Sequence, residues 1–123
     1  MEGVNIRYVD LDEDGSPKLD HLESILEADD TLKLVSLMHI NNEIGNLLDL
    51  DRVGALCKAK GAYFHTDAVQ GVGHFTFDLK SQPIDFLSSA AHKFHGPKGV
   101  GFTFIRKNNL CTCCRTKRPK REN

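Results

Sequence analysis

The stretch LVSLMHINNE, residues 34–43, gives the clearest indication of the fold. Its first half is almost continuously apolar, and such a short run indicates a strand buried on both faces, as in a parallel sheet. Its second half is polar. Open α/β sheets bind ligands beyond the carboxyl ends of their strands, which is where these polar residues should lie. The stretch therefore predicts an α/β protein with a ligand site at one edge of its sheet.

Further strands and helices are expected on both sides of this stretch. Residues 4–9 alternate apolar and polar, which predicts a half-buried strand. Other strands are expected over 62–66, from Asp85 onward and over 100–105. Two helices are expected from apolar residues at helical spacing: Leu19, Leu22, Ile25 and Leu26, and then Leu50, Val53, Leu56 and Cys57, closed by Gly61. This alternation predicts a mostly parallel sheet with flanking helices.

Composition places the chain among ordinary soluble proteins. Of its 123 residues, 40% are hydrophobic and 27% are charged. No apolar run approaches the roughly 20 residues that cross a bilayer, and the first residues lack the pattern of a signal peptide. A single cysteine before residue 106 fits a reducing compartment. We therefore expect a cytoplasmic protein with no membrane partner.

Charge divides the chain in two. Residues 1–105 carry 9 Lys/Arg and 16 Asp/Glu, a net charge of −7, whereas residues 106–123 carry 7 Lys/Arg and 1 Glu, a net charge of +6. Three of the four cysteines also lie in this last segment. We predict a folded domain over 1–106 and a basic, cysteine-containing, disordered tail over 107–123. No aromatic residues are interleaved with the basic ones, so no nucleic-acid partner is expected.

Three polar clusters follow predicted strands, at residues 39–43, 65–70 and 88–93. Because the carboxyl ends of parallel strands share one edge, the clusters should converge on one crevice. In the third cluster, Lys93 precedes a glycine-rich loop and could be drawn out of water. Desolvation lowers the pKa of an amine and makes it a nucleophile. Taken alone, Lys93 is more simply interpreted as a surface lysine.

Other residues of the clusters allow more than one role. Asp67 could pair with a protonated ring nitrogen, or it could cap a helix that begins near Ala68. Asn42 and Gln70 could hold the polar edge of a ligand, but such amides are also typical of turns. The spacing of His65 and Asp67 places both side chains on one face of a strand.

A metal site competes for some of the same residues. His65, Asp67, His92 and His95 offer imidazole and carboxylate groups, which bind transition metals. We favour no metal site, because Lys93 lies within the set. Cys57 falls on the apolar side of its predicted helix and is interpreted as a core residue.

Taken together, the clusters resemble signatures of the cysteine desulfurases, which belong to the class V aminotransferase group of fold-type I pyridoxal-phosphate enzymes. The matching stretches are VSLMHINNEIG (35–45), FHTDAVQ (64–70) and AHKFHGPKGVG (91–101). The resemblance runs from about Val4 to Arg106. It implies the central part of the large, cofactor-binding α/β domain of that fold.

The resemblance implies a role for each matching residue. Lys93 would be the catalytic residue that bonds pyridoxal 5′-phosphate covalently. Asp67 would pair with the protonated pyridine nitrogen and keep the ring an electron sink. Asn42 and Gln70 would contact the phenolic oxygen, and His92 would approach the phosphate.

The family reaction implies the substrate and partners. It takes sulfur from L-cysteine, leaving L-alanine and a persulfide on an enzyme cysteine. The sulfur passes to an iron–sulfur scaffold or another sulfur-acceptor protein for iron–sulfur cluster assembly. Members of the family are homodimers.

The chain also departs from the family pattern. Ala90 stands where the family usually has a phosphate-binding serine, and Cys57 does not match the family's persulfide cysteine. We interpret the chain as a fragment of a larger gene product and expect little or no turnover from it alone. The alternatives are another class V enzyme (a selenocysteine lyase or an aminotransferase), a metal-dependent hydrolase built on the histidines, and a non-enzymatic gene remnant.

Overall fold

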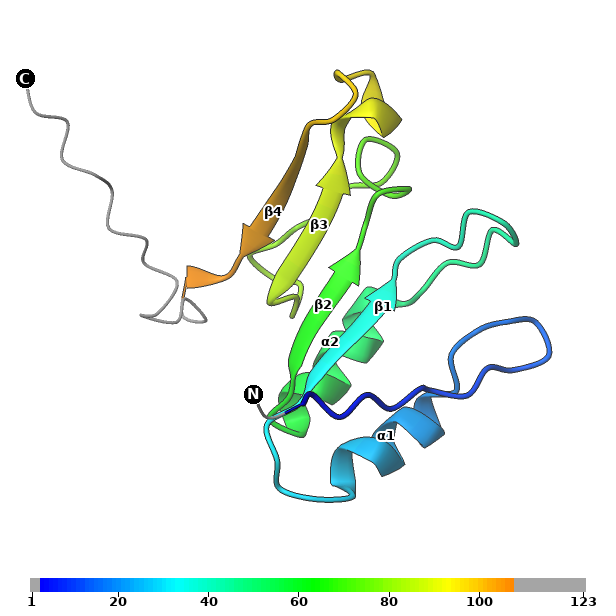
Figure 1. Cartoon of the computed structure of the whole chain (residues 1–123), viewed down its shortest axis with the longest axis vertical. Helices are drawn as coiled ribbons and strands as arrows, with labels where there is room; N and C mark the ends of the chain where they lie inside the picture. Colours follow the sequence, from blue (N-terminus) through cyan, green and yellow to red (C-terminus); the bar gives the residue numbers. More distant parts are fainter. Residues whose placement is uncertain (1–2, 108–123) are drawn as a thin grey trace, which may run out of the picture.

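The computed structural model describes residues 3–107. Its sheet has the strand order β1-β2-β3-β4, and the strands are β1 (Leu34–Met38), β2 (Tyr63–Asp67), β3 (Phe86–Ala90) and β4 (Gly101–Ile105). β1, β2 and β3 are parallel, whereas β4 is antiparallel to β3 (Figure 1). The helices are α1 (Leu19–Glu27) and α2 (Leu50–Ala59), and the 3₁₀ turn η1 (Ala91–Phe94) follows β3. The predicted mostly parallel α/β fold is confirmed.

The hydrophobic core lies between the two helices and one face of the sheet. Val53 and Cys57 of α2 are buried there with Phe64 of β2 and Leu87 of β3. α1 adds the buried Leu22 and Leu26 to the same cluster. Each large apolar side chain buried in this way contributes about 1.5–3 kcal/mol relative to an exposed one. The interpretation of Cys57 as a core residue is confirmed.

Both ends of α2 follow from local sequence. The carboxylate of Asp49 accepts a hydrogen bond from the backbone N–H of Arg52 at 3.0 Å, which caps the first turn. At the other end Gly61 has a φ of +68°, a conformation that glycine adopts without steric cost. Neither helix of the described residues is long and apolar enough to cross a membrane.

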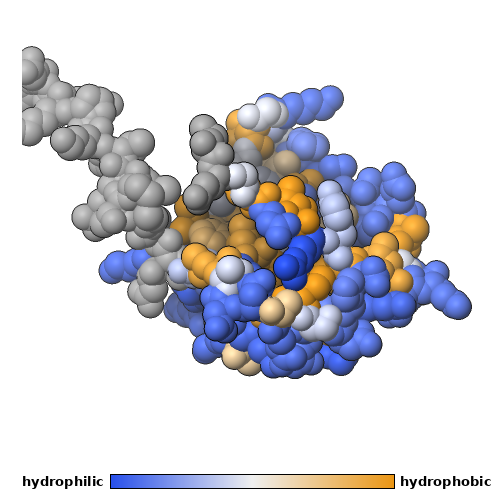
Figure 2. Space-filling view, turned by 60° about the horizontal axis from the view of Figure 1, so that its bottom comes forward, coloured by the Kyte–Doolittle hydropathy of each residue, from blue (hydrophilic) through white to orange (hydrophobic). Residues whose placement is uncertain are grey.

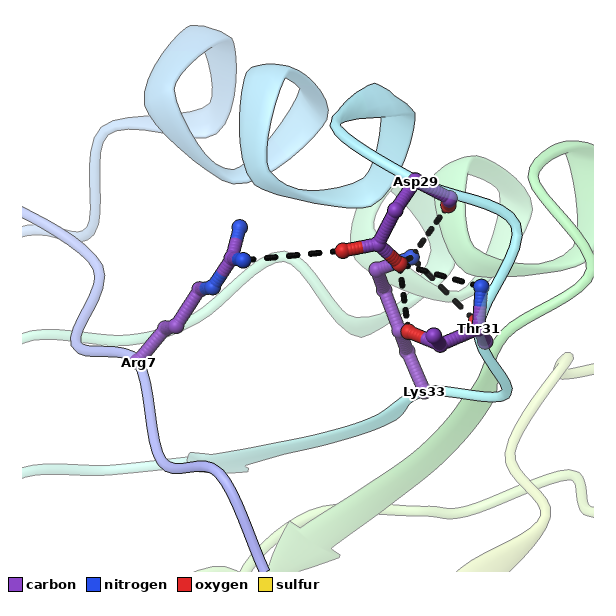
Figure 3. Close-up of polar contacts among 4 residues, drawn as sticks. All are labelled: Arg7, Asp29, Thr31 and Lys33. Carbon is purple, nitrogen blue, oxygen red and sulfur yellow. Dashed lines mark hydrogen bonds and ion pairs between the residues drawn. The ribbon is translucent and has the colours of Figure 1, made fainter.

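The expected strand over residues 4–9 does not form. Val4 and Tyr8 are 89% and 83% exposed, and the segment has no strand assignment. Arg7 of this segment pairs with Asp29 at 3.5 Å, and Lys33 donates to the same carboxylate at 2.7 Å (Figure 3). A strand needs backbone hydrogen bonds to a neighbour; β1 pairs only with β2 within the described residues, so its outer edge is open, but residues 4–9 do not pair with it.

Hydrogen bonds also determine the charge state of Asp29. The side chain of Lys33 donates to its carboxylate, as do the hydroxyl and the backbone N–H of Thr31. These donors hold the pKa of Asp29 well below its usual range. The network joins the loop after α1 to the start of β1 and is exposed, so it adds little to stability.

The prediction that β1 is covered on both faces is wrong for the described residues. Val35 is buried against the helices, but Leu34 and Met38 on the other face are 60% and 44% exposed. Both helices lie on the same side of the sheet, where they pack in the core cluster. The second face therefore stays open in the described part of the chain.

The expected helix near Ala68 is also absent. Residues 68–75 form successive turns, in which the carbonyl of Ala68 accepts from the N–H groups of Gly71 and Val72, both at 3.0 Å. Gly73 has a φ of +89°, which is incompatible with a right-handed helix. Two glycines within this short stretch account for the failure, since glycine costs about 1 kcal/mol per residue in a helix.

Candidate functional site at the carboxyl edge of the sheet

The three polar clusters do leave the sheet at one edge. Met38, Asp67 and Ser88 stand level in the register of β1, β2 and β3, and each lies at or near the end of its strand. The loops that follow all emerge from this edge (Figure 1). The three strands therefore end at one edge as predicted, whereas the single crevice predicted to hold the clusters is not seen in the described residues.

Asp67, the last residue of β2, is half-buried and held from two directions. Its carboxylate Oδ1 accepts a hydrogen bond from the N–H of Val69 at 3.0 Å. Its carbonyl accepts from the N–H of His39 at 2.9 Å. No hydrogen bond within residues 3–107 uses Oδ2, so one oxygen of a fixed carboxylate is left for a ligand.

Gln70 lies in the turn that follows, and glycines bring this turn against its neighbours. At Gly73, an added Cβ would lie 2.5 Å from Cβ of Phe94, so the turn is in close contact with η1. At Gly71, an added Cβ would lie 2.1 Å from Nδ1 of His39. The turn that carries Gln70 is thus placed between the end of β1 and η1.

The turn η1 places His92 and Lys93 directly after β3. The N–H of Ala91 donates to Val100 at 2.9 Å, and the N–H of Gly96 donates back to Ala91 at 2.8 Å, which closes the turn. Both His92 and Lys93 are exposed. Lys93 is thus a surface lysine in the described residues, and the alternative that it is drawn out of water is not observed.

Ala90 and Ser89 lie on opposite faces of β3. Ser89 is buried with the helices, and its hydroxyl has no hydrogen-bond partner in the described residues. Its orientation leaves the open face at this level without a hydroxyl from β3.

Asn42 lies on a separate loop between β1 and α2. It is exposed, and the neighbouring Asn41 shapes the turn by accepting from the N–H of Glu43 at 2.9 Å. Within residues 3–107, no hydrogen bond joins Asn42 to Asp67 or Lys93. The structure thus brings Asp67 and the turn of Gln70 together with η1, but it does not bring Asn42 to them.

A cleft of about 550 Å³ lies between the β1–α2 loop, the segment that leads into α1 and the start of α2. Asn41, Asn46 and Arg52 are among its lining residues, whereas neither Asp67 nor Lys93 lines it. The candidate site is therefore an open edge rather than this cleft.

His65 shares the open face of the sheet with Asp67, as the spacing predicts. Its Nδ1 lies 2.8 Å from the hydroxyl of Ser36, and its Nε2 lies 3.2 Å from that of Ser88. Both ring nitrogens are therefore engaged by hydroxyl groups. Among the described residues no group of three or more His, Cys, Asp or Glu could hold a metal ion, and the metal-dependent alternative has no structural support here.

Cys57 cannot serve as a mobile sulfur carrier. It is buried in the core, and this burial is the main cause that raises the pKa of its thiol to about 11. It is the only cysteine in the described part of the chain; Cys111, Cys113 and Cys114 lie outside it.

His39 is a site residue whose importance the sequence pattern did not reveal. It belongs to a polar cluster, yet it is only 5% exposed. Burial lowers the pKa of its imidazole, which favours the neutral form. The sequence does contain a pattern that predicts this burial: continuing the alternation of Val35 and Leu37 places His39 on the face that the helices cover.

An open α/β sheet with a lysine, a fixed carboxylate and amides along its carboxyl edge has the layout of a ligand-binding α/β domain. The sequence profile of the aminotransferase class-V family matches residues 1–117, and the chain belongs to this family. The match extends past Arg106 into the segment predicted as a separate tail. Residues 108–123 lie outside the described structure, so that boundary stays a prediction.

The chain is similar to curated proteins and solved structures that are named as cysteine desulfurases or as NifS-like proteins. The chain is 47% identical over 105 residues to cysteine desulfurase IscS of Clostridium botulinum (strain Hall) and 41% identical over 106 residues to that of Shewanella sp. (strain ANA-3). It superposes on a NifS-like protein with a TM-score of 0.77 at 43% identity, covering 85% of this chain and 29% of that one. For the apo cysteine desulfurase of Thermococcus onnurineus NA1, the TM-score is 0.74 at 31% identity, with 83% and 25% covered.

The matches cover most of this chain but only a small part of each relative. The matches take in 85% and 86% of this chain but only 26% of each curated relative. The chain thus spans about a quarter of the length of the relatives that it matches. The fold is that of the corresponding part of these enzymes, as the resemblance implied.

Proposed function

We propose that the chain is the central, cofactor-binding part of a cysteine desulfurase that uses pyridoxal 5′-phosphate. The observation that carries this proposal is the arrangement of Asp67, Gln70 and η1 at one sheet edge, in a chain whose relatives are named cysteine desulfurases. The proposed reaction takes sulfur from L-cysteine and leaves L-alanine. The cofactor supplies an electron sink for this chemistry when it is bound.

The chemistry of the available groups fits the cofactor. Asp67 offers a carboxylate that is held in place by Val69 and keeps one oxygen without a partner in the described residues. A negative charge of this kind favours a proton on a nearby ring nitrogen. Lys93 has no acidic partner within residues 3–107, so its amine is available for covalent attachment.

The remaining roles are proposed for amides and an imidazole. Gln70 and Asn42 would hold the phenolic oxygen, since neutral amides donate hydrogen bonds without adding charge. His92, exposed beside Lys93, would approach the phosphate.

We propose a cytoplasmic location, homodimeric assembly of the full-length protein and delivery of sulfur to an iron–sulfur scaffold or another acceptor protein. For the 123-residue chain alone we propose little or no turnover. The described residues contain no exposed cysteine to carry a persulfide, because Cys57 is buried. Steady production of alanine from cysteine by the pure chain would contradict this.

Substitution of Asp67 tests the cofactor role. Asp67→Asn keeps a side-chain oxygen to accept from Val69 but removes the negative charge. We expect pyridoxal phosphate to bind at least about tenfold more weakly, the factor that corresponds to about 1.4 kcal/mol. Titration of the chain with the cofactor, followed by absorbance, measures this. The control is Asp30→Asn on an exposed loop, and equal affinities for both variants would overturn the role of Asp67.

A further inference from the structure

His39 contacts three segments of the candidate site: the end of β2 at Asp67, the turn that carries Gln70 and the loop that carries Asn42. Its N–H donates to the carbonyl of Asp67 at 2.9 Å, and its own carbonyl accepts from the N–H of Leu48 at 2.8 Å. One residue therefore ties the end of β2 to the loop that carries Asn42.

The side chain of His39 is held by aromatic rings. The ring centroids of Phe75 and Phe77 lie 5.5 and 5.1 Å from that of His39, in edge-on geometry. The imidazole is 5% exposed, and its Nδ1 has no hydrogen-bond partner in the described residues. In such an apolar setting a charged imidazolium would be unpaired, so the neutral ring is favoured.

The backbone at Gly71 packs directly against the imidazole of His39. A Cβ at this position would lie 2.1 Å from Nδ1 of His39 and 3.1 Å from Cζ of Phe77. Gly71 is not among the described glycines with a positive φ, so backbone conformation does not demand a glycine here. The glycine is explained by the space that the ring of His39 occupies.

We propose that His39 is a positioning residue whose ring, seated on Gly71, fixes the turn of Gln70 relative to Asp67. Its relevance to the cofactor rests on the proposed function. Two side chains that contact one rigid ligand ring need placement to within about 0.5 Å, which a glycine-containing turn does not provide unaided.

Three variants test the contact: Gly71→Ala, His39→Ala and the double variant. Amide hydrogen exchange of the cofactor-free chain reports on the turn through the N–H groups of Gly71, Val72 and Phe75, all of which are bonded within it. Pyridoxal phosphate labelling with borohydride reduction reports on Lys93. Gly71→Ala forces the ring away, and His39→Ala leaves the turn unsupported. We expect each to speed exchange at these amides about tenfold or more and to lower the share of label on Lys93.

The double variant and a matched control separate positioning from general destabilisation. With the ring removed, the methyl group introduced by Gly71→Ala meets no imidazole, so the double variant should be no worse than His39→Ala alone. The control is Gly54→Ala, which lies on α2 and away from the turn. Its Cβ would lie 2.5 Å from the carbonyl oxygen of Pro83. It should lower the Tm without changing turn exchange or labelling measured well below that Tm.

The outcomes are distinguishable. If His39→Ala and Gly71→Ala lower the Tm but leave turn exchange at the wild-type rate, His39 is a core filler and the proposal is wrong. If the unsubstituted chain does not label Lys93 selectively, the proposed function fails, while the exchange measurement still decides the role of His39.

Discussion

At the scale of single residues, burial decides which reactive groups are usable. Cys57 and Lys93 illustrate the two extremes: the thiol lies in the core, and the amine lies exposed on η1. A nucleophile must be both reachable and in its reactive protonation state. Only Lys93 of these two can be reached without unfolding the chain.

The thiol of Cys57 should therefore resist alkylation. With its pKa raised to about 11, only about one molecule in a thousand carries a thiolate there at pH 8, and burial blocks access as well. Iodoacetamide at pH 8 should leave Cys57 unmodified in the folded chain and modify it fully in denaturant. Mass spectrometry of the peptides measures both. Rapid modification of Cys57 under native conditions would contradict its place in the core.

The imidazole of His39 should make stability depend on pH. Burial lowers its pKa in the folded chain, whereas the unfolded chain binds the proton near pH 6.5. The unfolded state thus holds more protons as the pH falls below about 6.5, and stability is lost in that range. Urea unfolding between pH 7 and 5 should show a steeper loss for the unsubstituted chain than for His39→Gln, which cannot titrate. If the stability of both proteins falls equally with pH, protonation of His39 does not destabilise the fold.

Residue-level reasoning from sequence placed the candidate residues after strands that end at one edge of the sheet, but it did not give their surroundings. The spacing of His65 and Asp67 correctly gave their shared face, because strand alternation is a local property. The exposure of Lys93 depends on which segments pack over η1, and that is set by distant parts of a chain. No local pattern encodes such packing.

At the scale of elements, the last strand is joined to the segment before β3 by one side chain. The guanidinium of Arg106 donates to the carbonyls of Leu79, Gln82 and Ile84 at 2.7–3.0 Å, and it lies over the ring of Phe104. Its hydrogen bonds organise the irregular loop over residues 79–84. This arrangement pairs the end of β4 with the start of β3.

Removing this side chain should destabilise the sheet edge. Arg106→Ala deletes charge-assisted hydrogen bonds, which are worth about 1.5–3 kcal/mol each, and the loop can partly relax, so we expect a loss of about 1–3 kcal/mol in the free energy of unfolding. The free energy of unfolding of Arg106→Lys should lie between those of the unsubstituted chain and Arg106→Ala, because one ammonium cannot reach the same set of carbonyls. Urea unfolding measures this, and an Arg52→Ala control on the surface of α2 should stay within about 0.5 kcal/mol. A similarly small effect of Arg106→Ala would contradict this account of the loop.

The elements that the sequence predicted correctly are those with complete local signals. α2 has an apolar stripe, a capping Asp49 and a terminal Gly61, and its bounds follow from them. The alternation over residues 4–9 is an equally regular pattern, but a strand also needs backbone hydrogen bonds to a neighbouring strand, which local alternation does not specify. None of the described strands pairs with it, and the segment stays extended and exposed.

At the scale of the whole molecule, the sheet has one covered and one open face. Leu34, Met38, Tyr63 and Ile105 are exposed apolar residues of its strands. From another side, hydrophilic residues cover most of the surface and separate apolar areas lie among them (Figure 2). Parallel sheets ordinarily have both faces covered, so a one-sided sheet agrees with a chain that spans about a quarter of its curated relatives.

The central claim is that the carboxyl edge of this sheet is a pyridoxal-phosphate site centred on Lys93. The most direct test incubates the 123-residue chain with pyridoxal phosphate, reduces it with borohydride and maps the modified lysines by mass spectrometry. We predict selective labelling of Lys93, retained in a Lys98→Ala control and lost in Lys93→Ala. Labelling spread over the lysines according to their exposure, or none at all, would contradict the claim.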